Sequence, residues 1–238
     1  MTEPVRLAKR LAAQLPCSRS QAEQYIEGGW VRVDGRVVQE PHFRVLHEKI
    51  ELDPNANLME LTPVTLLLHK PAGHASSQQL LNEATHWRED SSSTRLLKRH
   101  FSGLTPAVAL ESAASGLLVF TQDWRVARKL NEDDHLIEQE VIVEVKGEVT
   151  PAQLQQLMRE TDERGQALPP VKASLNSSSE GASKLRVAIK GVHLGLIAAL
   201  CERAGLHIQA MKRIRIGRVP MTQLPVGQWR YLQPFERF

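Results

Sequence analysis

The chain has 238 residues, of which 42% are hydrophobic and 24% are charged, and its formal net charge is +3 at pH 7. It contains no apolar run of roughly 18 residues or more, which excludes a membrane-spanning helix, and its N-terminal segment lacks the apolar core of a signal peptide. We therefore expect a soluble, cytoplasmic globular protein with a substantial core and no membrane partner.

The charge is distributed unevenly along the chain. Residues 53–183 carry 12 Lys and Arg against 18 Asp and Glu, a net charge of −6. Residues 184–238 carry 10 against 2, a net charge of +8. A basic block of this kind indicates an anionic partner, of which nucleic acid is the commonest, and a solvated basic face is the alternative.

The first 52 residues predict a small domain of two helices and a hairpin. Apolar residues recur at helical spacing over 6–15, and a second helix follows, capped by Ser18 or Ser20 and ended by a Gly-Gly pair. An Asp-Gly pair between two alternating runs predicts a hairpin over 30–38. A further strand is expected at 49–52.

This order of elements resembles the alpha-L RNA-binding domain, the type found in ribosomal protein S-four. The matching positions are Arg6, Leu7, Lys9, Leu11, Ser18, Arg19, Ala22, Ile26, Gly29, Val31, Val33, Gly35 and Val38. The resemblance implies RNA binding, for which the candidates are Arg6, Lys9, Arg10, Ser18, Arg19, Arg32 and Arg36. Arg19 stands at a helix start, where its guanidinium and the free N–H groups together favour a phosphate. For each residue alone, a solvated surface charge is the alternative.

A linker at 53–63, rich in Pro, Asn and small residues, precedes a second domain, so we predict domains at 1–60 and 61–238. Strands are predicted at 64–70, 116–122, 138–147, 184–191 and 208–219, helices at 123–132, 150–161 and 194–205, a partly helical polar segment at 85–100, a polar loop or hairpin end at 174–183 and a closing segment at 224–232. Thr150 as N-cap and Pro151 at the first helical position give one helix a clear start. Strands and helices interleave irregularly, which favours an α+β fold over regular βαβ units.

Four segments of the second domain resemble the bacterial rRNA pseudouridine synthases, a group that also carries an N-terminal alpha-L domain. They are the Lys-Pro-x-Gly turn at 70–73, the stretch "ALESAASGLLVFTQD" at 109–123, the strand at 211–217 and the closing Gly-x-Trp-Arg at 227–230. The resemblance implies a mixed, mainly antiparallel sheet flanked by helices. It also implies a cofactor-free reaction that detaches uracil from its ribose and reattaches it through carbon.

The same alignment places Glu111 at the family's catalytic aspartate, where a carboxylate is needed as a nucleophile or a base. Glutamate is one methylene longer, and a displacement of about 1 Å can cost on the order of a hundredfold in rate. The neighbouring positions also differ. Where the family has arginine, threonine, lysine, a base-stacking tyrosine and a catalytic basic residue, this chain has Ala109, Ala114, Gln139, Val141 and Ala198. A valine cannot replace a stacking ring worth roughly 1–3 kcal/mol per base.

The remaining candidate RNA contacts are Lys70 in the Lys-Pro turn and, in the basic strand, Lys212, Arg213 and Arg215. For Lys70, a structural role is the alternative.

These observations lead to three hypotheses about function. The first is an RNA-binding protein with weak or no synthase activity that acts on rRNA or a precursor, for example in ribosome assembly. The second is an active synthase that uses Glu111, and the third is a protein-interaction module without RNA binding. We expect a monomer that holds no cofactor and no metal.

Overall fold

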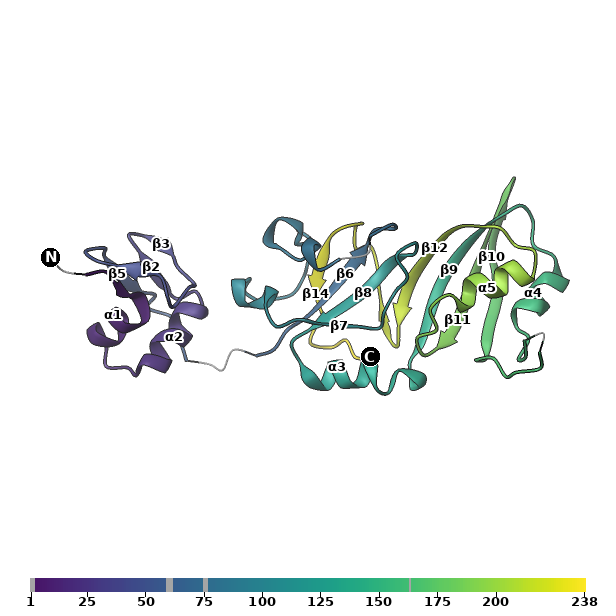
Figure 1. Ribbon diagram of the computed structural model, residues 1–238. Coiled ribbons are helices and arrows are strands. Elements are labelled where there is room, and N and C mark those ends of the chain that lie inside the picture. Colours follow the sequence, from purple (N-terminus) through teal and green to yellow (C-terminus); the bar gives the residue numbers. More distant parts are fainter. Residues whose placement is uncertain (1–2, 59–61, 75–76, 163) are drawn as a thin grey trace. The chain divides into compact units, whose positions relative to one another are not determined.

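The computed structural model describes residues 3–58, 62–74, 77–162 and 164–238. The chain divides into two compact units, one of Met1–Pro63 with Arg95–Gly103 and one of Val64–Thr94 with Leu104–Phe238 (Figure 1). The predicted boundary between residues 60 and 61, and part of the predicted linker, lie outside the described residues. That boundary stays a prediction.

The first unit contains two helices and short strands in the predicted order. Its elements are β1 (Val5–Arg6), α1 (Leu7–Gln14), α2 (Arg19–Glu27), β2 (Val31–Val33), β3 (Arg36–Val37), β4 (Arg44–Val45) and β5 (Ile50–Leu52). The strands β3, β2 and β5 form a small antiparallel sheet, and β1 pairs with β4. The helices cover a core in which Leu7, Leu11 and Ile26 are at most 2% exposed.

Two local features predicted from the sequence shape this unit. The Ser18 hydroxyl accepts from the Gln21 N–H at 3.2 Å, and Gln21 Oε1 accepts from the Ser18 N–H at 2.8 Å, a capping box that starts α2. Asp34 and Gly35 have φ angles of 49° and 80°. These left-handed conformations are what a two-residue turn between β2 and β3 requires.

The segment 95–103 joins the first unit from a later part of the chain. Arg95 Nη2 donates to the Gly29 carbonyl at 2.6 Å, and the Arg95 guanidinium lies 4.6 Å from the centroid of the Trp30 ring. The N–H of Lys98, in the 3-10 turn η3 (Lys98–Phe101), donates to Gln39 Oε1 at 2.8 Å. The sequence indicates only a polar, partly helical stretch here, so its packing on the first unit is a finding of the structure.

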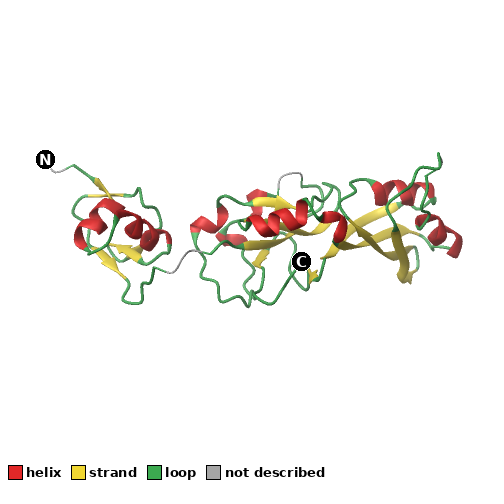
Figure 2. Ribbon diagram, turned by 90° about the horizontal axis from the view of Figure 1, so that it is seen from below, coloured by secondary structure: helices red, strands yellow, loops and turns green. Residues whose placement is uncertain are grey.

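The second unit is built on one mixed sheet. Its strands are β6 (Thr65–Lys70), β7 (Thr105–Ala107), β8 (Ser115–Thr121), β9 (Glu138–Lys146), β10 (Val171–Ser179), β11 (Ala182–Lys190), β12 (Ile208–Ile216), β13 (Val219–Pro220) and β14 (Trp229–Tyr231). Their order is β10-β11-β9-β12-β8-β6-β14, with β13 on β12 and β7 on β8. Among the described strands only the pair β12–β8 is parallel. The predicted α+β class with a mainly antiparallel sheet is confirmed (Figure 2).

Helices pack on this sheet in two places. The helices α4 (Pro151–Leu157) and α5 (Leu196–Arg203) enclose a core cluster with β9 and β11, whereas α3 (Trp124–Asn131) adds its buried Leu130 to a second cluster with β6 and β8. Thr150 caps α4 and Pro151 opens it, as predicted. Short 3-10 turns η1 (Gln78–Leu80), η2 (Glu83–Thr85) and η4 (Asp134–Leu136) complete the unit. No helix in the described part of the chain is long and apolar enough to cross a bilayer.

The polar stretch 174–183 extends a strand pair, which corrects the prediction of a loop over most of it. Residues 174–179 lie in β10, where every one of them is exposed, and the chain turns at Glu180 and Gly181 into β11. As the edge strand of the sheet, β10 has no apolar alternation over this stretch because neither of its faces is buried there. The stretch therefore forms the end of the β10–β11 hairpin, which is the other predicted alternative.

Candidate functional site

Glu111 lies in the loop 108–114, which connects β7 to β8. Val108 opens the loop with a φ of 55°, a left-handed conformation that a β-branched residue rarely adopts. The Ala114 N–H donates to the Glu111 carbonyl at 3.1 Å, and the Gly73 N–H donates to the Ser112 carbonyl at 2.7 Å. The backbone at the acid is therefore fixed by its own turn and by the Lys-Pro-x-Gly turn that follows β6.

The carboxylate of Glu111 caps helix α5. Glu111 Oε1 accepts a hydrogen bond from the Gly195 N–H at 2.6 Å, although the two residues are 84 positions apart. Gly195 is the N-cap residue of α5, with a φ of 82°, and as a glycine it has no side chain to offer the free N–H groups. A carboxylate at this end satisfies one such donor and is favoured by the helix dipole, an effect of roughly 0.5–2 kcal/mol.

Lys70 fixes one side of this loop from inside the fold. Its side chain, at the end of β6, is 2% exposed. Its ammonium group donates to the carbonyls of Pro71 at 3.0 Å, Ser112 at 3.0 Å and Ala114 at 2.6 Å. All three donors are thereby used. Burial and the positive charge of Arg213 lower the pKa of Lys70, and the charge of Glu111 opposes this shift.

Arg213 fixes the other side of the loop. The residue is 1% exposed, and its guanidinium donates to the carbonyls of Val108 at 2.7 Å and Ala109 at 2.9 Å, while Nε donates to the Leu117 carbonyl at 2.8 Å. Burial lowers the pKa of Arg213 to about 9, and the charge of Glu111 acts in the opposite direction. Two buried cations thus position the backbone on either side of Glu111, which supplies a nearby negative charge.

Gln139 and Gly116 complete the surroundings of Arg213. Gln139 Oε1 accepts from Arg213 Nη1 at 2.9 Å, and Gln139 Nε2 donates to the Gly191 carbonyl at 2.6 Å. Gly116 on β8 lies so close to β12 that an added Cβ would stand 2.2 Å from the Arg213 carbonyl oxygen. This approach, together with a φ of 115°, requires glycine at position 116.

These contacts correct two of the predicted RNA contacts. Lys70 and Arg213 are buried, and their donors are bound to carbonyls and an amide of the protein itself. They position the loop instead of facing RNA. For Lys70 this is the structural role that the sequence left open as the alternative. For Arg213 the sequence does not show the backbone carbonyls that meet its guanidinium, which explains the difference.

The remaining two basic residues of β12 differ from each other. Arg215 Nη2 lies 2.7 Å from Glu138 Oε1 and 2.9 Å from Glu140 Oε1, and the hydrogen bond from Arg215 to Glu140 raises the pKa of Arg215. Arg215 is thus held by two acids on the sheet, and its role as an RNA contact stays a prediction. Lys212 is half-buried, and its role stays a prediction.

The positions matched to the family's stacking ring and catalytic cation hold neither an aromatic nor a basic side chain. Val141 is 6% exposed and packs into the cluster around Leu185 and Leu200, and Ala198 is a half-buried residue of α5. Among the described residues, no ion pair joins Glu111 to a basic side chain. Positive charge near the acid comes instead from the buried Lys70 and Arg213, which form no ion pair with it.

In the first unit, the predicted RNA contacts lie at the surface. Six of these predicted contacts are exposed basic residues, namely Arg6, Lys9, Arg10, Arg19, Arg32 and Arg36. Arg19 pairs with Glu23 at 3.2 Å across one helical turn, an exposed pair that contributes little stability. Ser18 is exposed, but its hydroxyl oxygen already serves as the cap of α2. These residues stay predicted contacts, and their exposure leaves them accessible to a phosphate backbone.

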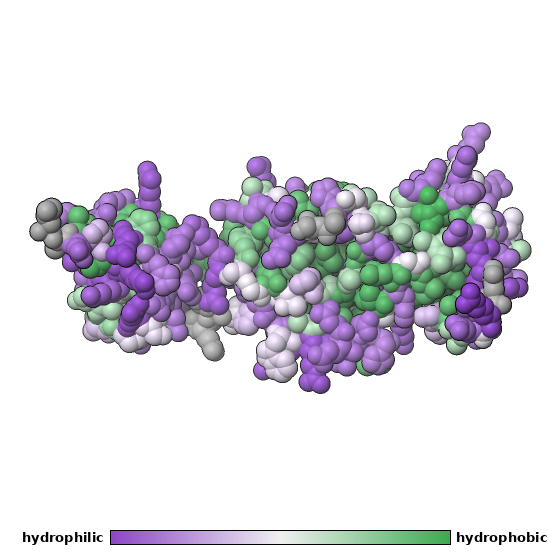
Figure 3. All heavy atoms as spheres, viewed as in Figure 1, coloured by the Kyte–Doolittle hydropathy of each residue, from purple (hydrophilic) through white to green (hydrophobic). Residues whose placement is uncertain are grey.

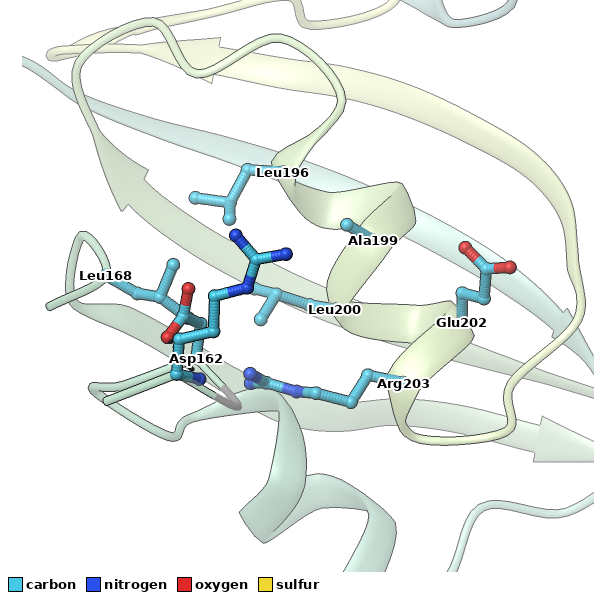
Figure 4. Close-up of a pocket in the computed structure, with 8 residues that line it drawn as sticks. Asp162, Leu168, Leu196, Ala199, Leu200, Glu202 and Arg203 are labelled. Carbon is cyan, nitrogen blue, oxygen red and sulfur yellow. Dashed lines mark hydrogen bonds between the residues drawn. The ribbon is translucent and has the colours of Figure 1, made fainter. Parts of the chain in front are cut away.

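A pocket of about 400 Å³ opens beside α5 (Figure 4). Leu196 and Leu200 point from the helix toward Leu168, and Arg203 extends toward the segment that carries Asp162. Two arginines and two acids line the pocket, so their charges balance, and Glu111 is not among the lining residues. The pocket has an apolar floor and no charge that selects an anion, so we do not include it in the candidate site.

Sequence reasoning missed the hydrogen bond between Glu111 and Gly195. A glycine directly before an apolar helical run is a recognisable cap position. No local pattern, however, indicates which distant side chain meets a glycine N-cap. The hydrogen bond forms only because the fold brings the β7–β8 loop to the N-terminal end of α5.

The chain is similar to known proteins along nearly all of its length. The S4 domain family matches residues 5–49. The chain is 27% identical over 232 residues to an "Uncharacterized RNA pseudouridine synthase" of Aquifex aeolicus, covering 96% of this chain and 92% of that one. It is 27% identical over 238 residues to "Ribosomal large subunit pseudouridine synthase B" of Bacillus subtilis, covering 97% and 93%. A crystal structure of a pseudouridylate synthase matches with a TM-score of 0.58 at 18% identity over 96% of each chain, which supports the fold.

Proposed function

The chain belongs to the family of rRNA pseudouridine synthases that carry an N-terminal S4 domain, and from this premise we propose that it binds rRNA or an rRNA precursor with weak or no synthase activity. The proposal needs no cofactor, because neither RNA binding nor the family's isomerisation uses one. It places the protein in the cytoplasm with its RNA, with ribosome assembly as one setting.

The main observation in support of weak or no synthase activity is the capping of α5 by Glu111. One carboxylate oxygen accepts the Gly195 N–H at 2.6 Å, which gives the acid a structural role. A catalytic carboxylate, whether nucleophile or general base, must present its oxygen to the sugar in a defined position. The positions matched to the family's stacking ring and catalytic cation offer no aromatic or cationic side chain to hold the uracil ring. Val141 and Ala198 stand where the family has those groups.

RNA binding is supported by the first unit. It matches the S4 domain family, and all six basic side chains predicted as RNA contacts there are exposed. Lys and Arg that neutralise phosphates release counterions, so the affinity for RNA is expected to fall steeply with salt. An affinity independent of salt would favour the third hypothesis, a protein-interaction module.

A second candidate function, an active synthase, is favoured by the charges around the loop. Lys70 and Arg213 both interact electrostatically with Glu111, so two buried positive charges lie near its carboxyl group. An ionised carboxylate is what either mechanism of the family requires. The two candidates therefore differ in whether the carboxylate reaches the sugar, and activity decides between them.

The test is a map of pseudouridine in rRNA from cells with the gene, without it, and with the Glu111→Gln variant. We expect the three maps to agree while the wild-type protein still crosslinks to RNA. A uridine that loses its modification in the deletion, and stays unmodified with Glu111→Gln, would establish the active synthase instead.

A further inference from the structure

The outward face of α3 carries an exposed aromatic ring beside cations. Trp124 is 66% exposed, and the Arg125 guanidinium lies 5.7 Å from the centroid of its ring. Arg128, one turn further along the helix, is exposed and pairs with Glu132 at 3.2 Å. The helix is anchored in the core by its buried Leu130, so the fold does not depend on burial of the indole.

A hollow of about 340 Å³ lies beside this face. Its lining includes Trp124, Arg125, Arg128, Lys129, Asp133 and Leu136. Three cations line it against one acid. Arg128 also pairs with Glu132 and Lys129 donates to the Phe238 carbonyl, so Arg125 and a displaceable Arg128 are the cations left for an anionic ligand. Figure 3 shows hydrophilic side chains gathered over α3, whereas hydrophobic ones gather over β8 and β12.

We propose that the α3 face, formed by Trp124, Arg125 and Arg128, binds a single-stranded segment of RNA. This inference rests on the proposed function of RNA binding and adds a contact surface in the second unit. A base stacks on an exposed indole whatever its identity, and guanidinium groups beside the ring pair with the flanking phosphates. The exposed Arg128–Glu132 pair contributes little, so a phosphate can replace the carboxylate.

The apolar part of the surface favours RNA over a protein partner. Trp124 and Leu136, which is 65% exposed, are the large apolar side chains at the hollow with most of their surface in water. A stable protein interface buries about 800 Å² on each partner around an apolar centre. One ring and one leucine among cations fit a stacked base better than such an interface.

The test compares the affinity of the full chain and its variants for two probes, total rRNA and a labelled 12-nucleotide oligouridylate. Trp124→Ala is expected to weaken oligouridylate binding about tenfold, the range expected when one stacked base loses its ring. Trp124→Phe, which keeps a ring, should weaken it less than about threefold. Phe235→Ala is the matched control, because it removes an even more exposed ring, at 80%, from the same unit and should leave the affinity unchanged.

A double variant, Arg125→Ala with Arg128→Ala, is expected to reduce the salt dependence of oligouridylate binding by about 0.7 for each phosphate that the two arginines neutralise in the wild type. If wild-type protein binds neither probe, the proposed function and this inference both fail. If it binds both and Trp124→Ala binds as tightly, only this inference fails. Loss of an acidic protein partner in Trp124→Ala, with RNA affinity intact, would show a protein-binding surface and also overturn it.

Discussion

The surface of the first unit and the core of the second unit use cations in opposite ways. In the first unit Lys9, Arg10 and Arg19 are exposed on helices and meet at most one carboxylate across a turn. In the second, Lys70 and Arg213 are at most 2% exposed and bind the carbonyls of the loop that carries Glu111. The contrast shows that burial separates two roles of basic residues in this protein. Exposed ones are available to RNA, whereas buried ones hold the backbone in position.

The largest expected effect comes from removing a buried cation. Arg213→Met leaves the carbonyls of Val108, Ala109 and Leu117 without their donor, so we expect a loss of about 3–5 kcal/mol in the free energy of unfolding. Denaturant unfolding measures it. Arg218→Met, at an exposed position two residues after β12, is the control and should change stability by less than about 0.5 kcal/mol. Equal free energies of unfolding for the two variants would show that the buried Arg213 supports the fold no more than an exposed arginine does.

Removing exposed cations of the first unit should change affinity without changing stability. Replacing Lys9, Arg10 and Arg19 together by Ala is expected to weaken rRNA binding on the order of a hundredfold and to reduce the slope of log affinity against log salt by about 2 to 3. Filter binding or fluorescence anisotropy at several salt concentrations measures both. A triple variant of exposed lysines in the second unit, Lys146, Lys172 and Lys190, matches the change in net charge. An equal loss in that control would mean that net charge, and not the S4 surface, determines affinity.

A smaller effect is expected at Glu111 itself. Glu111→Ala removes the cap of α5 and should destabilise the protein by about 1 kcal/mol, because the Gly195 N–H loses its acceptor. Glu111→Gln keeps an oxygen acceptor without the charge and should lose less. Thermal unfolding of the two variants gives the comparison. A Glu111→Ala variant as stable as wild type would refute the capping role.

The smallest expected effect is the contribution of His69 to the pH dependence of the free energy of unfolding. His69 is 2% exposed and its ring nitrogen Nδ1 donates to the Leu224 carbonyl at 2.7 Å, and burial lowers the pKa of His69 below its usual value near 6.5. Protons then bind more readily to the unfolded chain, so stability is lost as pH falls below about 6.5. His69→Asn keeps a donor but does not titrate, and the fall in unfolding free energy between pH 7.5 and pH 5 should shrink. In the first unit, burial also lowers the pKa of His100, to about 4, so part of the pH dependence remains. An unchanged slope in His69→Asn would exclude His69 as a contributor.

Much of the fold could be predicted from the sequence, because its local signals are strong. The cap at Ser18, the Asp34-Gly35 turn and the Pro151 helix start each fix a boundary through chemistry within a few residues. The polar edge strand β10 and the segment 95–103 could not be predicted in this way. Their conformations depend on distant partners, β11 for one and Gly29 with Trp30 for the other.

The candidate site was predictable in part. The position of Glu111 follows from the motif around it, and the absence of a stacking ring or cation follows from the residues at 141 and 198. A structural role for Lys70 was one of two alternatives from the sequence, and the role of Arg213 could not be predicted, because the sequence does not show whether a basic side chain faces solvent or backbone carbonyls. Only the packing of β8 against β12, close enough to require Gly116, decides this.

The central claim, that Glu111 supports the fold and does not catalyse, is tested most directly by isotope release. Rearrangement of a uridine frees the hydrogen on carbon 5, because that carbon bonds to the ribose. Purified wild-type protein and Glu111→Gln are therefore incubated with unmodified rRNA labelled with tritium at this position. We predict equal, background release from both proteins under conditions in which both bind the RNA. Repeated turnover by the wild type, absent from Glu111→Gln, would contradict the account.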